Sequence, residues 1–227
     1  KATDTHGSNI VDLDGDGILD LLVAVGGGLG GILLDGKESD ATDNMILWGE
    51  YQLNENTGKN VTIFRGGKAA AQDAGIDMRL ARGRMNYIID VNGDGLLDIY
   101  FAADRGRLHV LTPGKLFINQ GDRTWKEEEG VSEYSAAMIL TDVDGDGFAN
   151  ELVITRDHCY TQNLDPPYPD DKLSFCATRP VGTTAVYKFN RATNQMKDIG
   201  KQYSDVQAEN SMQPPCCKLG KGDTFAK

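Results

Sequence analysis

The feature that most constrains this chain is a nine-residue acidic segment that occurs three times. It first appears as Asp12-Leu-Asp-Gly-Asp-Gly-Ile-Leu-Asp20 and returns in modified form in residues 90–98 and 142–150. Each copy places oxygen-bearing side chains at positions 1, 3, 5 and 9, and a glycine at position 6 can adopt the positive φ of a tight turn. Hard oxygens that converge on one point suit Ca²⁺, which takes about six to eight oxygen ligands. Three copies, each followed by an apolar segment, indicate a repeat protein.

The predicted metal ligands are the side chains at positions 1, 3, 5 and 9 and the backbone carbonyl at position 7. They are Asp12, Asp14, Asp16, Ile18 and Asp20 in the first loop, Asp90, Asn92, Asp94, Leu96 and Asp98 in the second, and Asp142, Asp144, Asp146, Phe148 and Asn150 in the third. Because Asn150 carries no charge, we expect the third site to be the weakest or to rely on the adjacent Glu151. The expected cofactor is Ca²⁺, at about three ions.

The opening of this segment is shared with the calcium loop of an EF-hand. That loop closes with a glutamate at position 12 and lies between two helices. Position 12 is occupied here by Val23, Phe101 and Val153, and none of these side chains can bind a metal. The segments after the loops are short, rich in β-branched or aromatic residues and bounded by glycine or polar clusters, which is typical of strands. The loops are therefore predicted to lead into β-strands.

The acidity of the chain is explained by these loops. The 227 residues carry a formal net charge of −11, and ten of the carboxylates lie in the three segments. Three bound Ca²⁺ ions would leave a net charge of −5, so no basic partner is needed. Without a cluster of Lys and Arg, the chain is not expected to bind nucleic acid. Without an apolar run of about 18 residues, it is not expected to insert into a membrane.

The three acidic segments belong to longer repeats. After each loop and its strand, the sequence predicts a second strand, a polar turn and a third strand, and a fourth strand leads into the next loop. The predicted second and third strands are residues 45–48 and 61–64, 115–118 and 124–126, and 185–189 and 195–199. Such four-stranded antiparallel units describe the blades of a β-propeller. We therefore predict an all-β fold with about three blades, in approximate units 9–76, 85–131 and 136–204, followed by a connection over 205–227.

Propellers close with about four to eight blades, so three blades would form only part of a ring. The pattern is interrupted at both ends of the sequence, and the chain begins at Lys1 rather than at a methionine. We expect the ring to be completed by further blades of the same or another chain. The ends of the first two units, residues 72–76 and 128–131, are similar in sequence.

The loops and their flanking strands resemble the FG-GAP/VCBS repeats of integrin α-subunit propellers. The second unit, with Leu116-Phe117 followed by Asn119, Gly121-Asp122 and Thr124-Trp125, is similar to the related repeats of cartilage acidic protein-like secreted proteins. Neither a Phe-Gly nor a Gly-Ala-Pro tripeptide occurs, so the integrin likeness rests on the loops. The resemblance implies a seven-bladed ring, an extracellular location, and adhesion or recognition rather than catalysis.

Other chemistry is poorly supported. Residues 26–31 contain G-x-G-x-x-G after a predicted strand, but the helix that would hold a pyrophosphate does not follow. No G-x-S-x-G serine hydrolase motif is present, and the three histidines lie in different units. Carboxylates that hold Ca²⁺ are ionised and occupied, which makes them poor proton donors. The expectation is that the chain is not an enzyme and has no catalytic residue.

The cysteines and one glycosylation motif favour a secretory setting. Cys159 and Cys176 enclose a proline-rich stretch and are predicted to form a disulfide, while the adjacent Cys216 and Cys217 could pair with each other or elsewhere. Reduced thiols in another compartment remain the alternative. The triplet beginning at Asn60 is an acceptor for N-glycosylation, which on its own is a weak signal.

These observations lead to one main hypothesis and two alternatives. The main hypothesis is a secreted or lumenal calcium-binding recognition module, whose loops 25–44 and 155–183 present a surface to a protein or glycan. The first alternative is a propeller that serves as scaffold for a larger secreted enzyme, such as a polysaccharide lyase or a phospholipase. The second is a lectin. Fold alone does not distinguish among them.

Overall fold

The structure is a computed structural model that describes residues 5–26, 44–78, 81, 83–103, 113–133, 135–156 and 184–200. Within these ranges the chain forms three four-stranded antiparallel sheets and one short helix. The all-β prediction is confirmed, and the flanks of the acidic loops are strands rather than the helices of an EF-hand. Among the described residues, no helix is long and apolar enough to cross a membrane.

Each sheet is a meander in which consecutive strands pair. The first sheet contains β1 (Thr5–Val11), β2 (Asp20–Val25), β3 (Met45–Asn54) and β4 (Lys59–Gly67). The second contains β5 (Gly83–Ile89), β6 (Asp98–Ala103), β7 (Gly114–Asn119) and β8 (Trp125–Glu133). The third contains β9 (Ser135–Thr141), β10 (Glu151–Arg156), β11 (Thr184–Asn190) and β12 (Gln195–Asp198).

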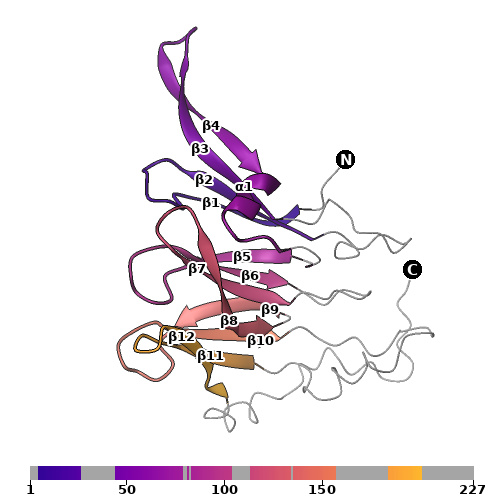
Figure 1. Cartoon of the computed structure of the whole chain (residues 1–227), viewed down its shortest axis with the longest axis vertical. Helices are drawn as coiled ribbons and strands as arrows, with labels where there is room; N and C mark the ends of the chain where they lie inside the picture. The colour runs from indigo at the N-terminus through magenta and orange to yellow at the C-terminus, as the bar shows by residue number, and fades with distance from the viewer. Residues whose placement is uncertain are drawn as a thin grey trace, which may run out of the picture.

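The three sheets are stacked face to face in chain order (Figure 1). Strands β1 and β2 contact β5, strands β5 and β6 contact β9, and β8 contacts β12. Strand β6 shows why the middle sheet needs both neighbours, because all six of its residues are buried. Ile99 and Phe101 belong to the core shared with the first sheet, whereas Tyr100 and Ala102 belong to the core shared with the third. The alternation of side chains along a strand thus supplies both interfaces at once.

The acidic loops occupy equivalent places in the three sheets. Each joins the first strand of its sheet to the second, and the three loops lie along the same side of the stack, on the left in Figure 1. Their closing residues pair in the ladder as Val11 with Asp20, Ile89 with Asp98, and Thr141 with Glu151. The register therefore aligns Glu151, and not Asn150, with Asp20 and Asp98.

The two segments that are similar in sequence differ in structure. Residues 128–131 lie within β8, whereas residues 72–76 cover the end of helix α1 (Lys68–Asp73) and the turn after it. Gly66 and Gly67 end β4 with φ values of 128° and 113°, which other residues rarely adopt. The sequence after them, Lys-Ala-Ala-Ala-Gln-Asp, is rich in good helix formers. Local propensity therefore overrides the similarity between the two repeats.

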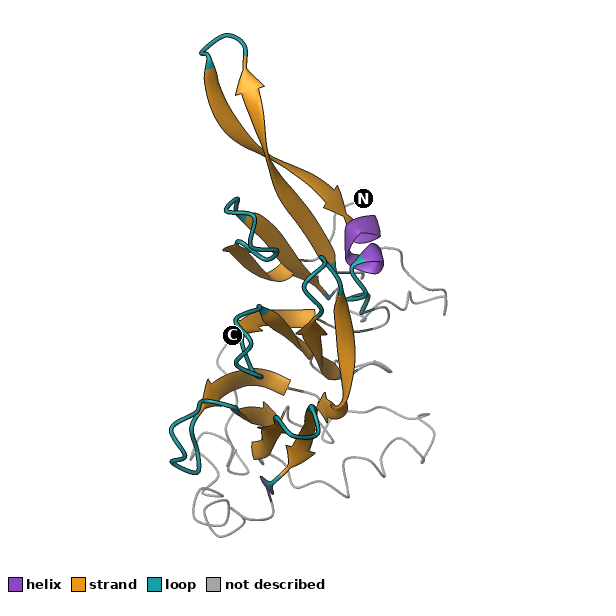
Figure 2. Ribbon diagram, turned by 60° about the vertical axis from the view of Figure 1, so that its left-hand side comes forward, coloured by secondary structure: helices purple, strands orange, loops and turns teal. Residues whose placement is uncertain are grey.

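The hairpin of β3 and β4 projects well beyond the other strands (Figure 2). Several features predicted from the sequence lie outside the described residues. These are Cys159, Cys176, Cys216, Cys217, His109, His158, most of the glycine-rich segment 26–31 and most of loops 25–44 and 155–183.

Candidate metal centres

The first aspartate of each loop organises the turn through backbone hydrogen bonds. Asp12 accepts from the N–H of Gly15 at 2.8 Å and of Gly17 at 2.9 Å. In the second loop Asp90 accepts from residues 93, 94 and 95 at 2.8, 3.1 and 3.0 Å. In the third loop Asp142 accepts from residues 145, 146 and 147 at 2.7, 3.1 and 2.9 Å. In all three copies the backbone of the turn therefore curves around the carboxylate at position 1.

Positions 3 and 5 repeat the same local pattern. The side chain at position 3 accepts from the N–H at position 5, and the side chain at position 5 accepts from the N–H at position 7. These bonds hold one oxygen of each side chain beside the turn. As a result the position-7 residues Ile18, Leu96 and Phe148 each donate a backbone N–H into the loop.

Two glycines per loop make this wrapping possible. In the first loop Gly15 and Gly17 have φ values of 77° and 86°, and the glycines at positions 4 and 6 of the other loops have φ values between 72° and 90°. The sequence pattern predicted a positive φ for the glycine at position 6 only. The structure shows that position 4 has the same requirement.

Position 9 of the first two loops is a buried carboxylate that joins three parts of its sheet. Asp20 accepts from Leu13 N at 2.9 Å and from Gly49 N at 2.8 Å. Asp98 likewise accepts from Val91 N at 3.0 Å and from Asn119 N at 2.9 Å. Each aspartate thus ties its loop to the third strand of the sheet.

Burial raises the pKa of both position-9 carboxyls. For Asp98 the pKa rises to about 6, because loss of hydration outweighs the hydrogen bonds from Asn119 and Val91, and the neighbouring Asp94 and Asp90 add repulsion. The pKa of Asp20 is also raised, chiefly by burial. A metal ion at these loops would offset the cost of burying the negative charges.

In the third loop a glutamate takes the place of the buried position-9 aspartate. Glu151 is buried, and its Oε2 accepts from Val143 N at 2.9 Å, as Asp20 and Asp98 accept from the equivalent N–H groups. Asn150 bonds to the neighbouring strand β11 instead. Its Nδ2 donates to Phe189 O at 3.3 Å, and its backbone carbonyl accepts from Phe189 N at 2.9 Å. The loop therefore has one extra residue before the strand.

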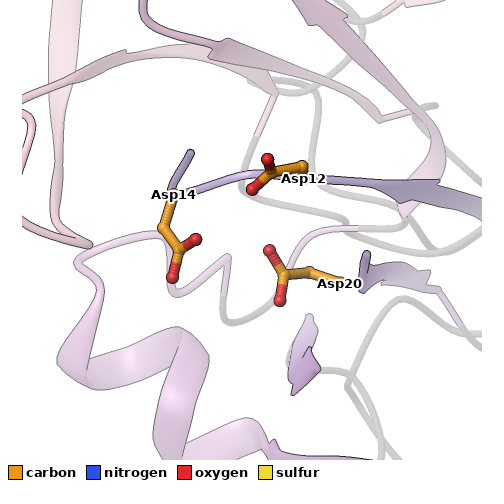
Figure 3. A group of neighbouring side chains, drawn as sticks. All are labelled: Asp12, Asp14 and Asp20. Atoms are coloured by element: carbon orange, nitrogen blue, oxygen red, sulfur yellow. The ribbon is translucent and has the colours of Figure 1, made fainter. Parts of the chain in front are cut away.

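Two groups of three carboxylates among the described residues could hold a metal ion such as Ca²⁺. They are Asp12, Asp14 and Asp20, and Asp142, Asp144 and Glu151, with ligand oxygens in each group within 4.8 Å of one another. This spacing suits Ca²⁺, whose oxygen ligands lie at about 2.3–2.6 Å from the ion. Figure 3 shows the carboxylates of Asp12, Asp14 and Asp20 turned toward a shared space. The second loop has Asn92 at position 3 and so brings an amide oxygen in place of one carboxylate.

An arginine from the next sheet contacts the first loop. Arg123, in the β7–β8 turn, places Nε 2.5 Å from Asp14 Oδ2 and Nη2 3.4 Å from Asp16 Oδ2. Its guanidinium also lies over the ring of Trp48, 5.0 Å from the centroid. Among the described residues, Asp12 and Asp20 have no cationic partner, so Arg123 is paired with only one of the three carboxylates of this group.

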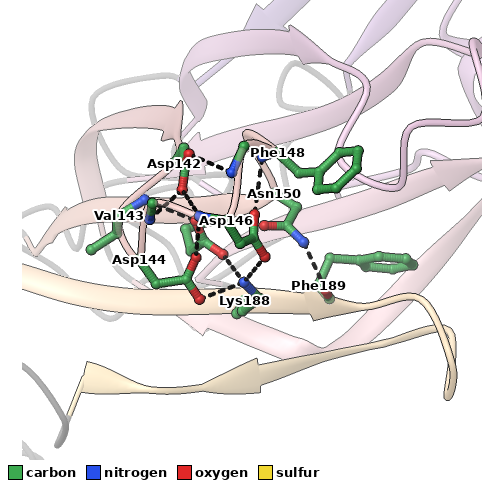
Figure 4. Close-up of polar contacts among 11 residues, drawn as sticks. Asp142, Val143, Asp144, Asp146, Phe148, Asn150, Lys188 and Phe189 are labelled. Carbon is green, nitrogen blue, oxygen red and sulfur yellow. Dashed lines mark hydrogen bonds and ion pairs between the residues drawn. The ribbon is translucent and has the colours of Figure 1, made fainter.

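A lysine from the same sheet lies inside the third loop. The Nζ of Lys188 is 2.6 Å from Asp144 Oδ2, 2.7 Å from Asp146 Oδ2 and 2.8 Å from Glu151 Oε1. Figure 4 shows the Lys188 ammonium between Asp144 and Asp146. These hydrogen bonds raise the pKa of Lys188, and that of Asp146 is lowered chiefly by its bond to Lys188. Both groups are therefore charged at neutral pH.

Arg123 and Lys188 were missed by sequence reasoning. Lys188 could have been found by aligning β3, β7 and β11, because it stands where the first two of these strands have an apolar residue. Arg123 carried no such signal, because its contact with the first loop depends on how two sheets pack.

Comparison with known protein families identifies an FG-GAP-like repeat over residues 90–153. The matched segment begins at the second acidic loop, includes β6 to β9 and the third loop, and ends within β10. FG-GAP repeats form propeller blades, so the match agrees with the stack of four-stranded sheets and confirms the resemblance predicted from the loops. A comparison with curated proteins found no match.

Proposed function

We propose that this chain is a calcium-stabilised recognition module within an extracellular β-propeller, and that it has no catalytic role. The observation that carries the proposal is the first loop, in which three carboxylates of one rigid turn face a shared space with their oxygens within 4.8 Å. Such an arrangement brings negative charges together at a cost that a divalent cation would remove. The metal has a structural role here, since it would fix the angle at which each sheet begins.

The second position of each acidic loop supports the view that these sheets are part of a larger ring. Leu13 is buried in the core between the first and second sheets, and Val91 is buried in the core between the second and third. Val143, at the same position of the third loop, is only partly buried. A further blade packed on the third sheet would bury Val143 as its equivalents are buried.

The projecting β3–β4 hairpin supports a role in recognition. Directly opposed residues of antiparallel strands share a face, and Gly49 pairs with Phe64 while Tyr51 pairs with Thr62. Tyr51, Leu53 and Phe64 therefore lie on one face, where they are 60%, 58% and 43% exposed. An exposed apolar and aromatic face of this kind suits a protein or glycan partner. Asn60, the glycosylation acceptor, is exposed near the tip of the same hairpin.

The proposed location is extracellular or lumenal, where a Cys159–Cys176 disulfide would be stable. Mass mapping of a digest made without reduction tests this pairing. Free thiols at both positions in protein from its native source would contradict the assignment.

Thermal unfolding of the intact protein tests the calcium proposal. We expect millimolar Ca²⁺ to raise the melting temperature relative to EDTA, because an ion that binds only the folded state at 100 times its Kd adds about 2.7 kcal/mol. Mg²⁺ should substitute poorly, since it prefers a tighter octahedral shell and retains its waters. Equal melting temperatures in EDTA and Ca²⁺ would overturn the proposal.

A matched pair of variants assigns the effect to the first loop. Asp14→Ala removes one of the three convergent carboxylates and should reduce the Ca²⁺-dependent rise. Asp73→Ala removes an exposed carboxylate at the end of α1 that is not among the predicted ligands, and should leave the rise unchanged. Equal behaviour of the two variants would show that the first loop is not a site of binding.

A further inference from the structure

We propose that Lys188 takes the place of Ca²⁺ in the third loop, so that this loop is held by a built-in cation and does not require metal. The inference rests on the proposed calcium role of the other loops. It revises the expectation of about three ions to two for this chain.

The strand register shows that a lysine stands where the other two sheets have apolar residues. Leu152 pairs with Tyr187 and Glu151 with Lys188, so Lys188 lies directly across the ladder from the residue at the loop's end. The equivalent partners are Trp48 opposite Asp20 and Ile118 opposite Asp98, by extension of the pairs of Leu21 with Leu47 and Ile99 with Phe117. Only the third of these side chains can deliver a positive charge into its loop.

The ammonium group contacts three carboxylates around the loop. Nζ donates hydrogen bonds to Asp144 Oδ2 at 2.6 Å and to Asp146 Oδ2 at 2.7 Å, and it forms an ion pair with Glu151 Oε1 at 2.8 Å. Two of those residues, Asp144 and Glu151, also belong to the group of three carboxylates that could hold a metal. An ion bound by these carboxylates would have to share their oxygens and the surrounding space with a positive ammonium. These carboxylate oxygens therefore fit a lysine ammonium group, and they do not fit Ca²⁺ while the lysine is present.

A second change in the same loop accompanies the lysine. Glutamate replaces aspartate at the residue aligned with Asp20 and Asp98, and its longer side chain reaches Val143 N with one oxygen and Lys188 with the other. The extra residue before the strand also allows Asn150 N to donate to Phe148 O at 3.1 Å, so the carbonyl expected to bind metal already accepts one hydrogen bond. In the first two sheets, both oxygens of the aligned aspartate accept backbone N–H groups instead.

Arg123 does not have the same effect on the first loop. It comes from the neighbouring sheet, its side chain is 52% exposed, and of the three carboxylates that could hold a metal in the first loop it pairs only with Asp14. Asp12 and Asp20 stay unpaired with cations among the described residues. A Ca²⁺ ion could therefore bind the first loop while Arg123 rotates toward solvent, whereas Lys188 is held on the strand that faces its loop.

Hydrogen exchange read by mass spectrometry on peptides over residues 12–20, 90–98 and 142–151 of the intact protein tests the inference. In EDTA we expect the third loop to exchange more slowly than the other two, because its cation is already present. Adding Ca²⁺ should slow exchange in the first two loops by about tenfold or more and leave the third loop unchanged. Calorimetry should find two ions bound by this chain's loops.

Lys188→Met keeps the length of the side chain and removes its charge. We expect the third loop of this variant to exchange faster in EDTA, to gain protection on adding Ca²⁺, and to raise the calorimetric count by one. Lys188→Arg retains a positive charge and should behave as the wild type does. Lys115→Met is the matched control, since Lys115 is equally exposed at 25% but pairs with Glu127 away from the loops. Unchanged exchange over β5–β8 shows that a variant is folded.

The outcomes separate the two proposals. No response to Ca²⁺ at any loop overturns the calcium proposal, while the comparison of wild type with Lys188→Met in EDTA still decides the role of Lys188. Protection of the wild-type third loop by Ca²⁺, to the same degree as the first, overturns the inference about Lys188. So does a Lys188→Met variant whose third loop exchanges as slowly as the wild type in EDTA.

Discussion

Arg123 and Asp14 form an ion pair between two sheets, with Nε of the arginine 2.5 Å from Oδ2 of the aspartate. The arginine belongs to the β7–β8 turn of the second sheet, and the aspartate to the acidic loop of the first. The same guanidinium lies over Trp48, whose ring stacks on Trp125 of the second sheet at 6.4 Å. The loop of one sheet is thus linked to the edge of the next by charge and by aromatic packing together.

We expect Arg123→Met to lower the free energy of unfolding by about 1 kcal/mol, from the lost ion pair and cation–π contact. The loss should be larger in EDTA than in Ca²⁺, because a bound ion would replace part of the positive charge beside Asp14. Urea unfolding under both conditions measures it.

Arg65→Met provides the comparison for this prediction. Arg65 pairs with Glu50 at 2.9 Å within one sheet, and both side chains are more than half exposed. Such a surface pair contributes little, so this variant should stay close to the wild type. A cost for Arg65→Met equal to that for Arg123→Met would contradict a special role for the link between sheets.

The pH dependence of stability should report on Asp98. In metal-free protein the folded-state pKa of this carboxyl is about 6, above its ordinary value of 3.8, so the folded state holds the proton more tightly than the unfolded chain. The stability from this group is fully present below pH 3.8 and is lost as pH rises through 6. Its size is at most about 3 kcal/mol. With Ca²⁺ bound, the ionised form is favoured and the trend should reverse.

Asp98→Asn isolates this contribution, because the amide does not titrate over this range. In EDTA the stability of the wild type relative to Asp98→Asn should fall between pH 4 and pH 7, and in Ca²⁺ it should rise. The amide adds a penalty that does not vary with pH, since its nitrogen cannot accept one of the two backbone N–H bonds. A relative stability that is flat with pH under both conditions would show that the pKa of Asp98 is not raised.

Glycine at position 4 should be more sensitive to substitution in the second loop than in the third. Gly93 and Gly145 have similar φ values of 72° and 75°, so alanine at either position carries a backbone cost of about 1 kcal/mol. A Cβ at Gly93 would also come within 2.4 Å of Arg191 Nη2, whereas one at Gly145 would meet nothing within 4 Å. Because Nη2 is the far end of a flexible, exposed side chain that can move aside, we expect Gly93→Ala to be only slightly more destabilising than Gly145→Ala in chemical unfolding.

Replacing Arg191 checks the cause of this difference. In a background of Arg191→Ala, the clash at Gly93 is removed and the two alanine variants should cost the same. A difference that persists in this background would assign it to the backbone rather than to Arg191.

The local structure of the loops could be predicted from the sequence because it depends on neighbours two to five residues apart. The carboxylates of Asp12, Asp14 and Asp16 bind backbone N–H groups of their own turn, and the glycines allow the chain to curve around them. The strands after the loops were predictable for the same reason, since an alternating or continuous apolar pattern depends only on residues that are adjacent in the sequence. The confirmed fold class and the FG-GAP-like repeat both follow from these short-range patterns.

Tertiary structure decided which groups share space with each loop. Lys188 meets Glu151 because β10 and β11 pair in one particular register, and a shift of one residue would turn the lysine to the opposite face. Arg123 reaches Asp16 across 107 positions only because the second sheet stacks on the first. Strand register and sheet packing therefore determine whether a loop carries its own cation or requires one from solution. The nine-residue motif alone does not determine this.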